Sequence, residues 1–258
     1  MSIMDRLHQG GNVPKPIMTI YGRPGIGKTT LAAHAPNPIF FETERGLTNP
    51  DLSHVQTFGL LHSLEEFNEG LAAVAQHHGK QKWETVVIDS IDRLNPLIER
   101  AVCAANKWKS LEEGAYGKGK NLFREEWQKV LTKLIRLRDE CSVGIILLGH
   151  HAMAKISPPD ADPFTQYTLT LDEKVRQLVV ADSDIVAFAT YPTHTVSTDQ
   201  GFGKKATRAI TEAPVLALRE TGAYVAKNRY GMPDKLPMHW EALAQHIPCY
   251  ALKQKEAK

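Results

Sequence analysis

The sequence GRPGIGKT at residues 22–29 matches the phosphate-binding pattern G-x-x-x-x-G-K-[ST] at every fixed position. An apolar run at 17–21 precedes it, and a segment with helical character follows from Lys28 to about Ala35, where Pro36 ends it. In such a loop, glycines let backbone N–H groups turn towards phosphates, and the following helix directs its positive end at the same anion. The residues expected to contact the nucleotide are Gly22, Arg23, Pro24, Gly25, Ile26, Gly27, Lys28, Thr29 and Thr30.

Lys28 and Thr29 are expected to bind the phosphates and a magnesium ion. The lysine would reach the β and γ phosphates of ATP, and the threonine hydroxyl would bind Mg²⁺. A second metal-binding group is expected at Asp89, which ends an apolar strand as the acid of a Walker B segment does. Asp89, Ser90 or Asp92 could instead cap the helix that follows, and capping by Ser90 is compatible with metal binding by Asp89.

The composition is that of a globular protein able to bury a sizeable core: 42% of the 258 residues are apolar and 23% are charged. The formal net charge of +2 does not by itself indicate a nucleic-acid partner, although a local basic stripe is compatible with it. The three cysteines are widely spaced, which argues against a disulfide framework or zinc site and favours a reducing cytoplasm. No apolar run is long enough to span a bilayer, so no membrane partner is expected.

Apolar runs alternate with helical segments, which predicts an α/β fold. We expect a mostly parallel, twisted β-sheet flanked by helices, with a C-terminal β-hairpin extension over 193–212. Residues 1–14 are expected to be a flexible leader, 15–250 a single core and 251–258 a tail. The predicted strands are 17–21, 38–42, 85–89, 143–149, 184–190 and 224–227. The predicted helices are 28–35, one from Ser63, 91–106, 122–139, 171–180 and 240–246.

The acids that could activate water lie at the end of the second predicted strand. Ser90 stands directly after Asp89, where several branches of P-loop proteins place a glutamate, so the neighbouring strand is the alternative position. That strand ends in Glu42 and, after one spacer, Glu44, an arrangement that resembles the RecA-like branch. The resemblance implies that Glu44 polarises the attacking water and that Glu42 is secondary. The alternative is a solvated acidic turn.

Two later segments carry the same resemblance. In VAKNRYG at 225–231, Lys227 and Arg229 are spaced like the basic pair that RecA-like proteins and ring helicases direct at a neighbouring subunit's γ-phosphate. Both would project from one side of a strand, so the active site would be complete only in an oligomer. A basic edge strand is the alternative. His150 ends the strand 143–149, where RecA-like proteins place a γ-phosphate sensor, often a glutamine; a surface histidine is the alternative.

The layout from about Pro16 to Trp240 resembles phage ATP-binding proteins of the AAA-domain family with a bare RecA-like core, some of which are single-strand annealing recombinases. The resemblance implies a RecA-like P-loop ATPase that is phage-encoded, acts in the bacterial cytoplasm, uses ATP and Mg²⁺, and hydrolyses slowly or when stimulated by DNA. It further implies a homo-oligomer, as a ring or a filament. The implied partners are single-stranded DNA and a single-strand-binding protein.

DNA contacts would have to come from loops of the core. The break at 113–120 and the segment 152–170 both mix aromatic and basic residues, although Asp160 and Asp162 weaken the second. Each could equally be an ordinary mobile surface loop, as could the proline-rich stretch at 157–163. The residues expected to contact DNA are Tyr116, Lys118, Lys120, Arg124 and Lys155.

The leading hypothesis is an oligomeric RecA-like ATPase that binds single-stranded DNA and promotes annealing or strand exchange in phage recombination. One alternative is a nucleotide-gated switch or assembly ATPase that acts on protein partners, which predicts nucleotide-dependent oligomers without DNA affinity. The other is a ring helicase-type motor, which ranks lower because no additional loading or stacking domain is visible.

Overall fold

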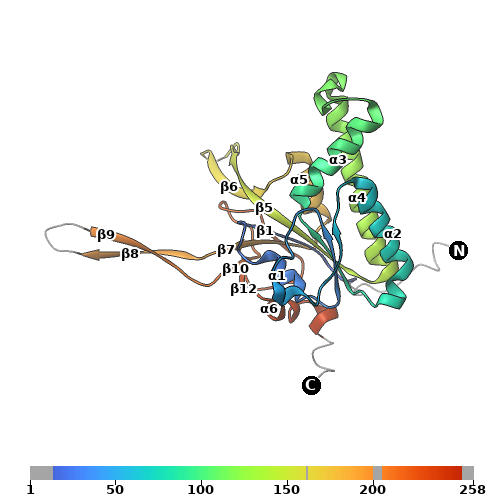
Figure 1. Cartoon of the computed structure of the whole chain (residues 1–258). Helices are drawn as coiled ribbons and strands as arrows, with labels where there is room; N and C mark the ends of the chain where they lie inside the picture. Colours follow the sequence, from blue (N-terminus) through green and yellow to red (C-terminus); the bar gives the residue numbers. More distant parts are fainter. Residues whose placement is uncertain (1–13, 161, 200–204, 252–258) are drawn as a thin grey trace, which may run out of the picture.

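A ten-stranded β-sheet with helices on both faces forms the body of the protein (Figure 1). The computed structural model describes residues 14–160, 162–199 and 205–251. The strands are β1 (Ile17–Gly22), β2 (Pro38–Glu42), β3 (Gln56–Leu60), β4 (Thr85–Asp89), β5 (Gly144–Ile156), β6 (Phe164–Leu169), β7 (Ile185–Thr190), β8 (Thr193–Asp199), β9 (Lys205–Thr211), β10 (Val215–Ala217), β11 (Lys227–Asn228) and β12 (Lys235–Pro237). The helices are α1 (Lys28–Ala33), α2 (Leu64–Gln81), α3 (Ile91–Asn106), α4 (Lys118–Cys141), α5 (Glu173–Asp182) and α6 (Trp240–Ala244).

The central strands are parallel and bring their carboxyl ends to one edge. The order is β12-β10-β7-β1-β5-β4-β2-β3, and every pair from β7 to β3 is parallel. β1 and β5 pair up to Gly22 and His150, and β2 and β4 pair up to Glu42 and Asp89. The antiparallel strands β10, β11 and β12 extend the sheet on the β7 side. This arrangement confirms the predicted α/β fold.

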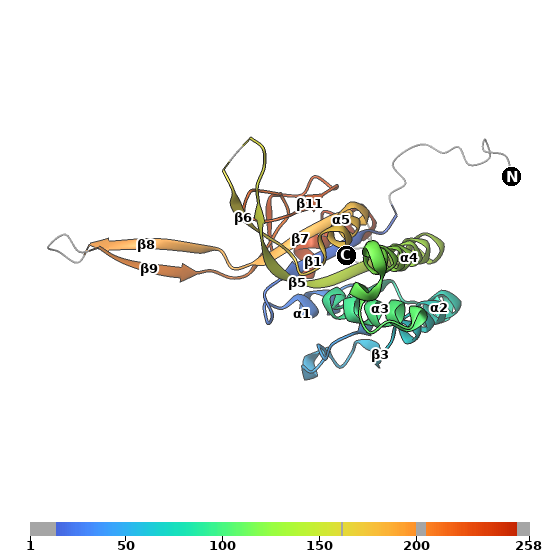
Figure 2. The same ribbon diagram turned by 90° about the horizontal axis from the view of Figure 1, so that it is seen from above.

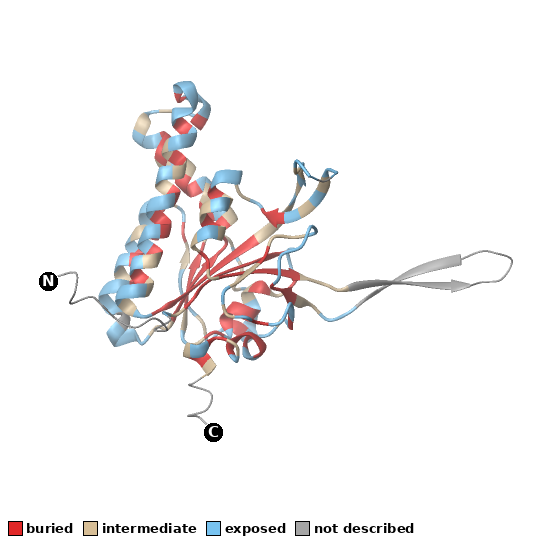
Figure 3. Ribbon diagram, turned by 180° about the vertical axis from the view of Figure 1, so that it is seen from behind, coloured by how far each residue is buried: buried red, intermediate tan, exposed pale blue. Residues whose placement is uncertain are grey.

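Two apolar layers cover the sheet, one on each face (Figure 3). Helices α2, α4 and α5 pack on one face through residues such as Phe67, Trp127 and Val179. Helices α1 and α6 pack on the other, with Leu31 and Trp240 among the buried side chains. Each long helix buries one stripe and exposes the other, as its apolar periodicity predicts. In the described ranges, no helix has both the length and the apolar character needed to cross a membrane.

Two β-ribbons leave the sheet at the edge where β1 ends (Figures 1 and 2). One is the antiparallel pair β5–β6 and the other is the antiparallel pair β8–β9. The second ribbon confirms the hairpin expected over 193–212, whose turn at 200–204 lies outside the described residues. Both ribbons extend well beyond the helices that cover the sheet.

The prediction of a loop over 152–170 is wrong, because most of this segment forms the β5–β6 ribbon. β5 continues past His150 to Ile156, and β6 returns beside it. Exposed and less exposed side chains alternate along β5 from Ala152 to Ile156, as they do on the faces of a ribbon. The backbone groups beyond the sheet thereby pair with each other. Lys155 therefore lies on a strand and not in an open loop.

The helical arm of α3 and α4 also differs from the expectation. The segment 113–120 is not an open break, because two short 3₁₀ turns within 111–117 lead directly into α4, which begins at Lys118. Gly119 makes this close packing possible: a Cβ added there would lie 2.0 Å from the carbonyl oxygen of Leu111. The arm projects beyond the sheet (Figure 1).

Several boundaries differ in smaller ways. The late strand expected over 224–227 is reduced to the two residues of β11, Lys227 and Asn228. β3, β10 and β12 have no predicted counterpart, because strands of three to five residues carry little periodicity. The expected leader and tail, 1–14 and 251–258, fall almost entirely outside the described residues.

Candidate nucleotide-binding site

The loop between β1 and α1 lines a polar cavity of about 350 Å³. Gly25 and Gly27 have φ values of 74° and 104°, a region that favours glycine. Gly22 packs under β7, where an added Cβ would lie 2.4 Å from the carbonyl oxygen of Ala189. The cavity is lined by Pro24, Gly25, Gly27, Lys28, Thr29, Thr30, Glu44, Arg45, Gly46, Asp89 and His150. Of the predicted nucleotide contacts, Gly22, Arg23 and Ile26 belong to the loop without lining this cavity.

Lys28 is buried against its own loop. Its Nζ donates hydrogen bonds to the carbonyl oxygens of Gly22 at 3.2 Å and Arg23 at 3.1 Å. Burial lowers the pKa of Lys28, and nearby carboxylates, Asp89 foremost, oppose that shift. No carboxylate forms an ion pair with this ammonium group within the described part of the chain, so a bound phosphate would supply the missing negative charge.

Thr29 and Asp89 meet at the side of the cavity. Thr29 Oγ1 donates a hydrogen bond to Asp89 Oδ2 at 2.7 Å, and burial raises the pKa of the Asp89 carboxyl. A hydroxyl and a carboxylate are the hard oxygen donors that Mg²⁺ prefers. Gly46 covers this pair without a side chain, since an added Cβ would lie 2.7 Å from Asp89 Oδ2. The residues present therefore fit a magnesium ion.

The two acids at the end of β2 have different environments. Glu42 is buried in register with Asp89 and accepts a hydrogen bond from Thr57 Oγ1 at 2.6 Å. Glu44 lines the cavity, and its carboxylate lies 3.5 Å from Arg93 Nε. Glu44 is therefore the acid placed to meet a water molecule beside a bound phosphate, whereas Glu42 is occupied in the sheet.

Thr43 connects the end of β2 to the residue after β4. Its Oγ1 donates to the carbonyl oxygen of Ser90 at 2.6 Å and accepts from the Ser90 N–H at 2.8 Å. The backbone N–H groups of Thr43 and Glu44 both donate to the carbonyl oxygen of Asp89. These bonds hold Glu44 and Asp89 in a fixed relation. Sequence reasoning treated Thr43 as a spacer, and no local pattern signals its role.

His150 lines the cavity from β5 and is held by an acid that sequence reasoning missed. Asp92 Oδ2 accepts the backbone N–H of His150 at 2.7 Å and lies 3.1 Å from its Nδ1. Asp92 was expected only as an alternative helix cap. The carboxylate occupies Nδ1, so Nε2 is the ring nitrogen that remains to meet a phosphate.

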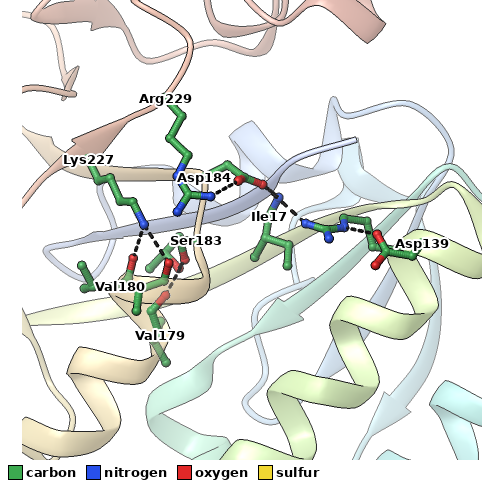
Figure 4. Close-up of polar contacts among 11 residues, drawn as sticks. Ile17, Asp139, Val179, Val180, Ser183, Asp184, Lys227 and Arg229 are labelled. Atoms are coloured by element: carbon green, nitrogen blue, oxygen red, sulfur yellow. Dashed lines mark hydrogen bonds and ion pairs between the residues drawn. The ribbon is translucent and has the colours of Figure 1, made fainter. Parts of the chain in front are cut away.

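Lys227 and Arg229 each have partners within the chain (Figure 4). Lys227 Nζ donates to the carbonyl oxygens of Val180 and Ala181 at 2.8 Å each, while Arg229 forms an ion pair with Asp184 at 2.9 Å. Burial lowers the pKa of Lys227. The Arg229 side chain is 56% exposed. The two cations therefore do not converge on one anion inside this chain.

The position of this basic pair excludes contact with a nucleotide bound at the chain's own phosphate loop. Lys227 pairs with Val186 near the start of β7, whereas Gly22 pairs with Ala189 near its end. Parallel strands β1 and β7 thus place the phosphate loop at one edge of the sheet and Arg229 towards the other. Any contact of Arg229 with a nucleotide would involve another copy of the chain.

The end of the α3–α4 arm brings together three of the five predicted DNA contacts. Tyr116 is fully exposed and has a left-handed backbone, with φ 52° and ψ 33°. Lys118 and Lys120 follow in the first turn of α4, and both are exposed. Arg124 instead lies 3.6 Å from Asp172, next to α5. Lys155 is exposed on the β5–β6 ribbon, away from this group.

Comparison with known proteins identifies the family. A family described as AAA domain matches residues 15–230. The SPbeta prophage-derived uncharacterized protein YorG of Bacillus subtilis (strain 168) is 26% identical over 180 residues, which are 67% of this chain and 50% of YorG. The chain thus matches about half the length of that curated relative.

One solved structure supports the architecture. The RadB recombinase structure aligns with a TM-score of 0.50 and 16% identity, covering 93% of this chain and 94% of RadB. A KaiC-like protein from Pyrococcus horikoshii OT3 aligns with a TM-score of 0.38 and 13% identity, covering 83% and 90% of the two chains. The likeness to RadB supports a RecA-like fold, in agreement with the sheet order and the phosphate loop. By the match over most of its length, the chain belongs to the AAA domain family.

Proposed function

We propose that the chain binds and hydrolyses ATP, assembles into an oligomer and acts on single-stranded DNA. The observation that carries the ATPase part is a single cavity lined by Lys28, Thr29, Asp89, Glu44 and His150. Lys28 neutralises charge on the β and γ phosphates, and Glu44 accepts a proton from the attacking water. Thr29 and Asp89 would hold Mg²⁺, which when bound offsets phosphate charge and orients the phosphates.

The oligomer part rests on Arg229 and Lys227. Their distance from the chain's own phosphate loop and the 56% exposure of Arg229 leave the guanidinium accessible to a neighbouring copy. In this role Arg229 would exchange its Asp184 partner for the γ-phosphate of the neighbour's ATP, with Lys227 beside it. The subunits would then form a ring or a filament, and each active site would include residues of two chains.

The DNA part rests on the end of the α3–α4 arm. An exposed aromatic ring can stack on any base, and Lys118 and Lys120 supply positive charge for the phosphate backbone. The fold of the RadB recombinase and the prophage origin of YorG are compatible with a role in phage recombination, through annealing or strand exchange. Binding of this kind weakens steeply as salt rises, because lysines release counterions from DNA.

A titration tests the proposal as a whole. Fluorescence anisotropy of a labelled oligothymidine is measured with and without ATP at two salt concentrations, and light scattering reports the particle mass in the same samples. We expect salt-sensitive binding, a larger particle with ATP and DNA, and weaker binding by Tyr116→Ala. Phe58→Ala, at the far edge of the sheet, is the matched aromatic control. No binding at low salt in either condition would contradict the DNA part, and an ATP-dependent mass change alone would then favour a switch acting on protein partners.

A further inference from the structure

A second cavity lies beside the phosphate loop, between the roots of the two β-ribbons. It has a volume of about 430 Å³. The strands that carry its lining, β5, β6 and β7, meet where the β5–β6 ribbon and the β8–β9 ribbon diverge (Figure 2). The residues that line it include Arg23, His151, Met153, Tyr167 and Phe188. We refer to this cavity as the ribbon cavity.

Aromatic rings form a rigid wall of the ribbon cavity. Phe188, which is buried, lies nearly parallel to Tyr167, with ring centroids 5.2 Å apart and planes 20° apart. Tyr224 stacks on Phe188 at 5.3 Å and Tyr21 packs against it at 5.1 Å. Tyr167 is therefore held by a buried aromatic cluster and remains 37% exposed. Such a ring is a preformed stacking surface.

Three further features suit a polar, planar and anionic ligand. His151 lies edge-on to Tyr167, with ring centroids 5.3 Å apart, and lines the cavity beside it, although its Nδ1 is covered by neighbouring atoms. The Arg23 side chain is exposed, and no carboxylate in the described ranges pairs with it. Met153 is 69% exposed at the rim, which adds a polarizable apolar contact. A partly exposed stacking ring, an apolar rim and an exposed cation together match a nucleotide unit.

We propose, on the basis of the DNA binding proposed above, that the ribbon cavity takes an unstacked base of single-stranded nucleic acid. Tyr167 stacks on the base, the His151 ring borders it, and Arg23 contacts the adjacent phosphate. This site is separate from the α3–α4 arm, so one strand would contact the protein at two places.

The placement of this site also relates it to the nucleotide cavity. His150 and His151 are consecutive in β5, and consecutive strand residues point to opposite faces. His150 accordingly lines the nucleotide cavity, and His151 lines the ribbon cavity. Arg23 lines the ribbon cavity and directly precedes Pro24 and Gly25, which line the nucleotide cavity, so the phosphate loop borders both cavities.

Two substitutions at Tyr167 and one at Met153 test the assignment. Tyr167→Leu keeps apolar volume over Phe188 but removes the ring, and Tyr167→Phe keeps the ring. We expect the leucine variant to bind oligothymidine about tenfold or more weakly and the phenylalanine variant to bind within about twofold of the parent, since stacking depends on the ring. Met153→Asp, which leaves the stack intact and adds a repulsive charge at the rim, should also weaken binding. Phe58→Leu is the matched control and should bind like the parent.

Photocrosslinking gives a readout that does not depend on stability. An oligonucleotide carrying 5-iododeoxyuridine should label the peptides that contain His151, Met153 or Tyr167, and Tyr167→Leu should lose that label. If the parent binds the oligonucleotide but labels only the α3–α4 arm, and if Tyr167→Leu and Met153→Asp bind as it does, the ribbon-cavity site is wrong while DNA binding stands. If the parent does not bind at all, the proposed function fails first. Circular dichroism of each variant confirms that the fold is retained.

Discussion

Replacing Arg229 by alanine separates a stabilising role of this residue from a catalytic one. The guanidinium pairs with Asp184 at 2.9 Å, but it is 56% exposed. Asp184 keeps two other partners when Arg229 is removed: the Ile17 N–H at 3.0 Å and Arg138 at 3.7 Å (Figure 4). The carboxylate is thus not left uncompensated in the protein interior.

The expected loss of stability is therefore small. An exposed ion pair is worth about 0.2–1 kcal/mol, and most of the charge on Asp184 remains balanced. By contrast, an arginine supplied to a neighbour's phosphoryl-transfer site raises kcat by about 10³–10⁵. The two roles predict effects of very different size, so Arg229→Ala should fold almost normally and turn over ATP at least about 10³ times more slowly.

Two measurements check this. Urea unfolding gives the stability, and phosphate release at saturating ATP gives kcat with and without single-stranded DNA. Mixing Arg229→Ala subunits with Lys28→Ala subunits should then restore part of the activity, because some interfaces pair an intact nucleotide site with an intact arginine. Parent-like turnover by Arg229→Ala, or a mixture no more active than its components, would refute the shared site.

Three further outcomes are expected. Glu44→Gln should lower kcat by about 10²–10⁴-fold, because the base is lost, while ATP affinity stays close to that of the parent. Phosphate release measures kcat, and a fluorescent-ATP titration measures affinity. Full turnover by this variant would show that another group accepts the proton. Gly46→Ala should push Asp89 away from Thr29 and weaken Mg²⁺-dependent nucleotide binding by about 10–100-fold, with little change when EDTA removes the metal. Asp184→Ala should lower the free energy of unfolding by about 1–3 kcal/mol, because it leaves the Ile17 N–H without its acceptor while Arg138 keeps Asp139 as a partner. Asp184→Asn, which keeps an acceptor for the Ile17 N–H, should cost clearly less in urea unfolding.

The parts of the site that could be predicted are those fixed by short segments at strand ends. Lys28 and Thr29 follow from one continuous pattern, and Asp89 and Glu44 follow from the ends of two apolar runs. Parallel pairing then brings these ends to one edge, because β2 and β4 are in register up to Glu42 and Asp89. The pattern at each strand end, combined with the rule that parallel strands bring their carboxyl ends to one edge, was sufficient to predict that these residues lie together.

The residues that support the site could not be predicted, because their roles depend on tertiary contacts. Asp92 reads in the sequence as a helix-capping residue, yet it binds His150, which is far away in the chain. Thr43 reads as a spacer, yet its hydroxyl pairs with both backbone groups of Ser90. Arg124 reads in the sequence as a basic residue next to the segment 113–120, yet it lies beside Asp172 at the start of α5. None of these partners is marked by a sequence pattern.

β5 is predicted correctly as a strand, but its predicted end at Gly149 lies well before its observed end at Ile156. The apolar run that predicts β5 stops at Gly149, because only that part is buried between helices on both faces. Beyond it the strand continues with alternating exposure, which resembles a loop in a search for apolar runs. The pairing partner changes at one peptide bond: β5 pairs with β1 up to His150 and with β6 from His151 onward.

This change of partner has a mechanical consequence. β5 has parallel neighbours on both sides up to Leu148 and pairs with β1 up to His150, so the histidine that lines the nucleotide cavity belongs to the main sheet. From His151, β5 pairs with β6, and β6 is anchored by the backbone hydrogen bonds of Tyr167 with Ala223 and Val225 and by the stacking of Tyr167 on Phe188. A ligand that stacks on Tyr167 would therefore act on the β5–β6 side of this junction, and ATP on the side of the main sheet. The two histidines mark the boundary across which nucleotide and strand binding would have to be coupled.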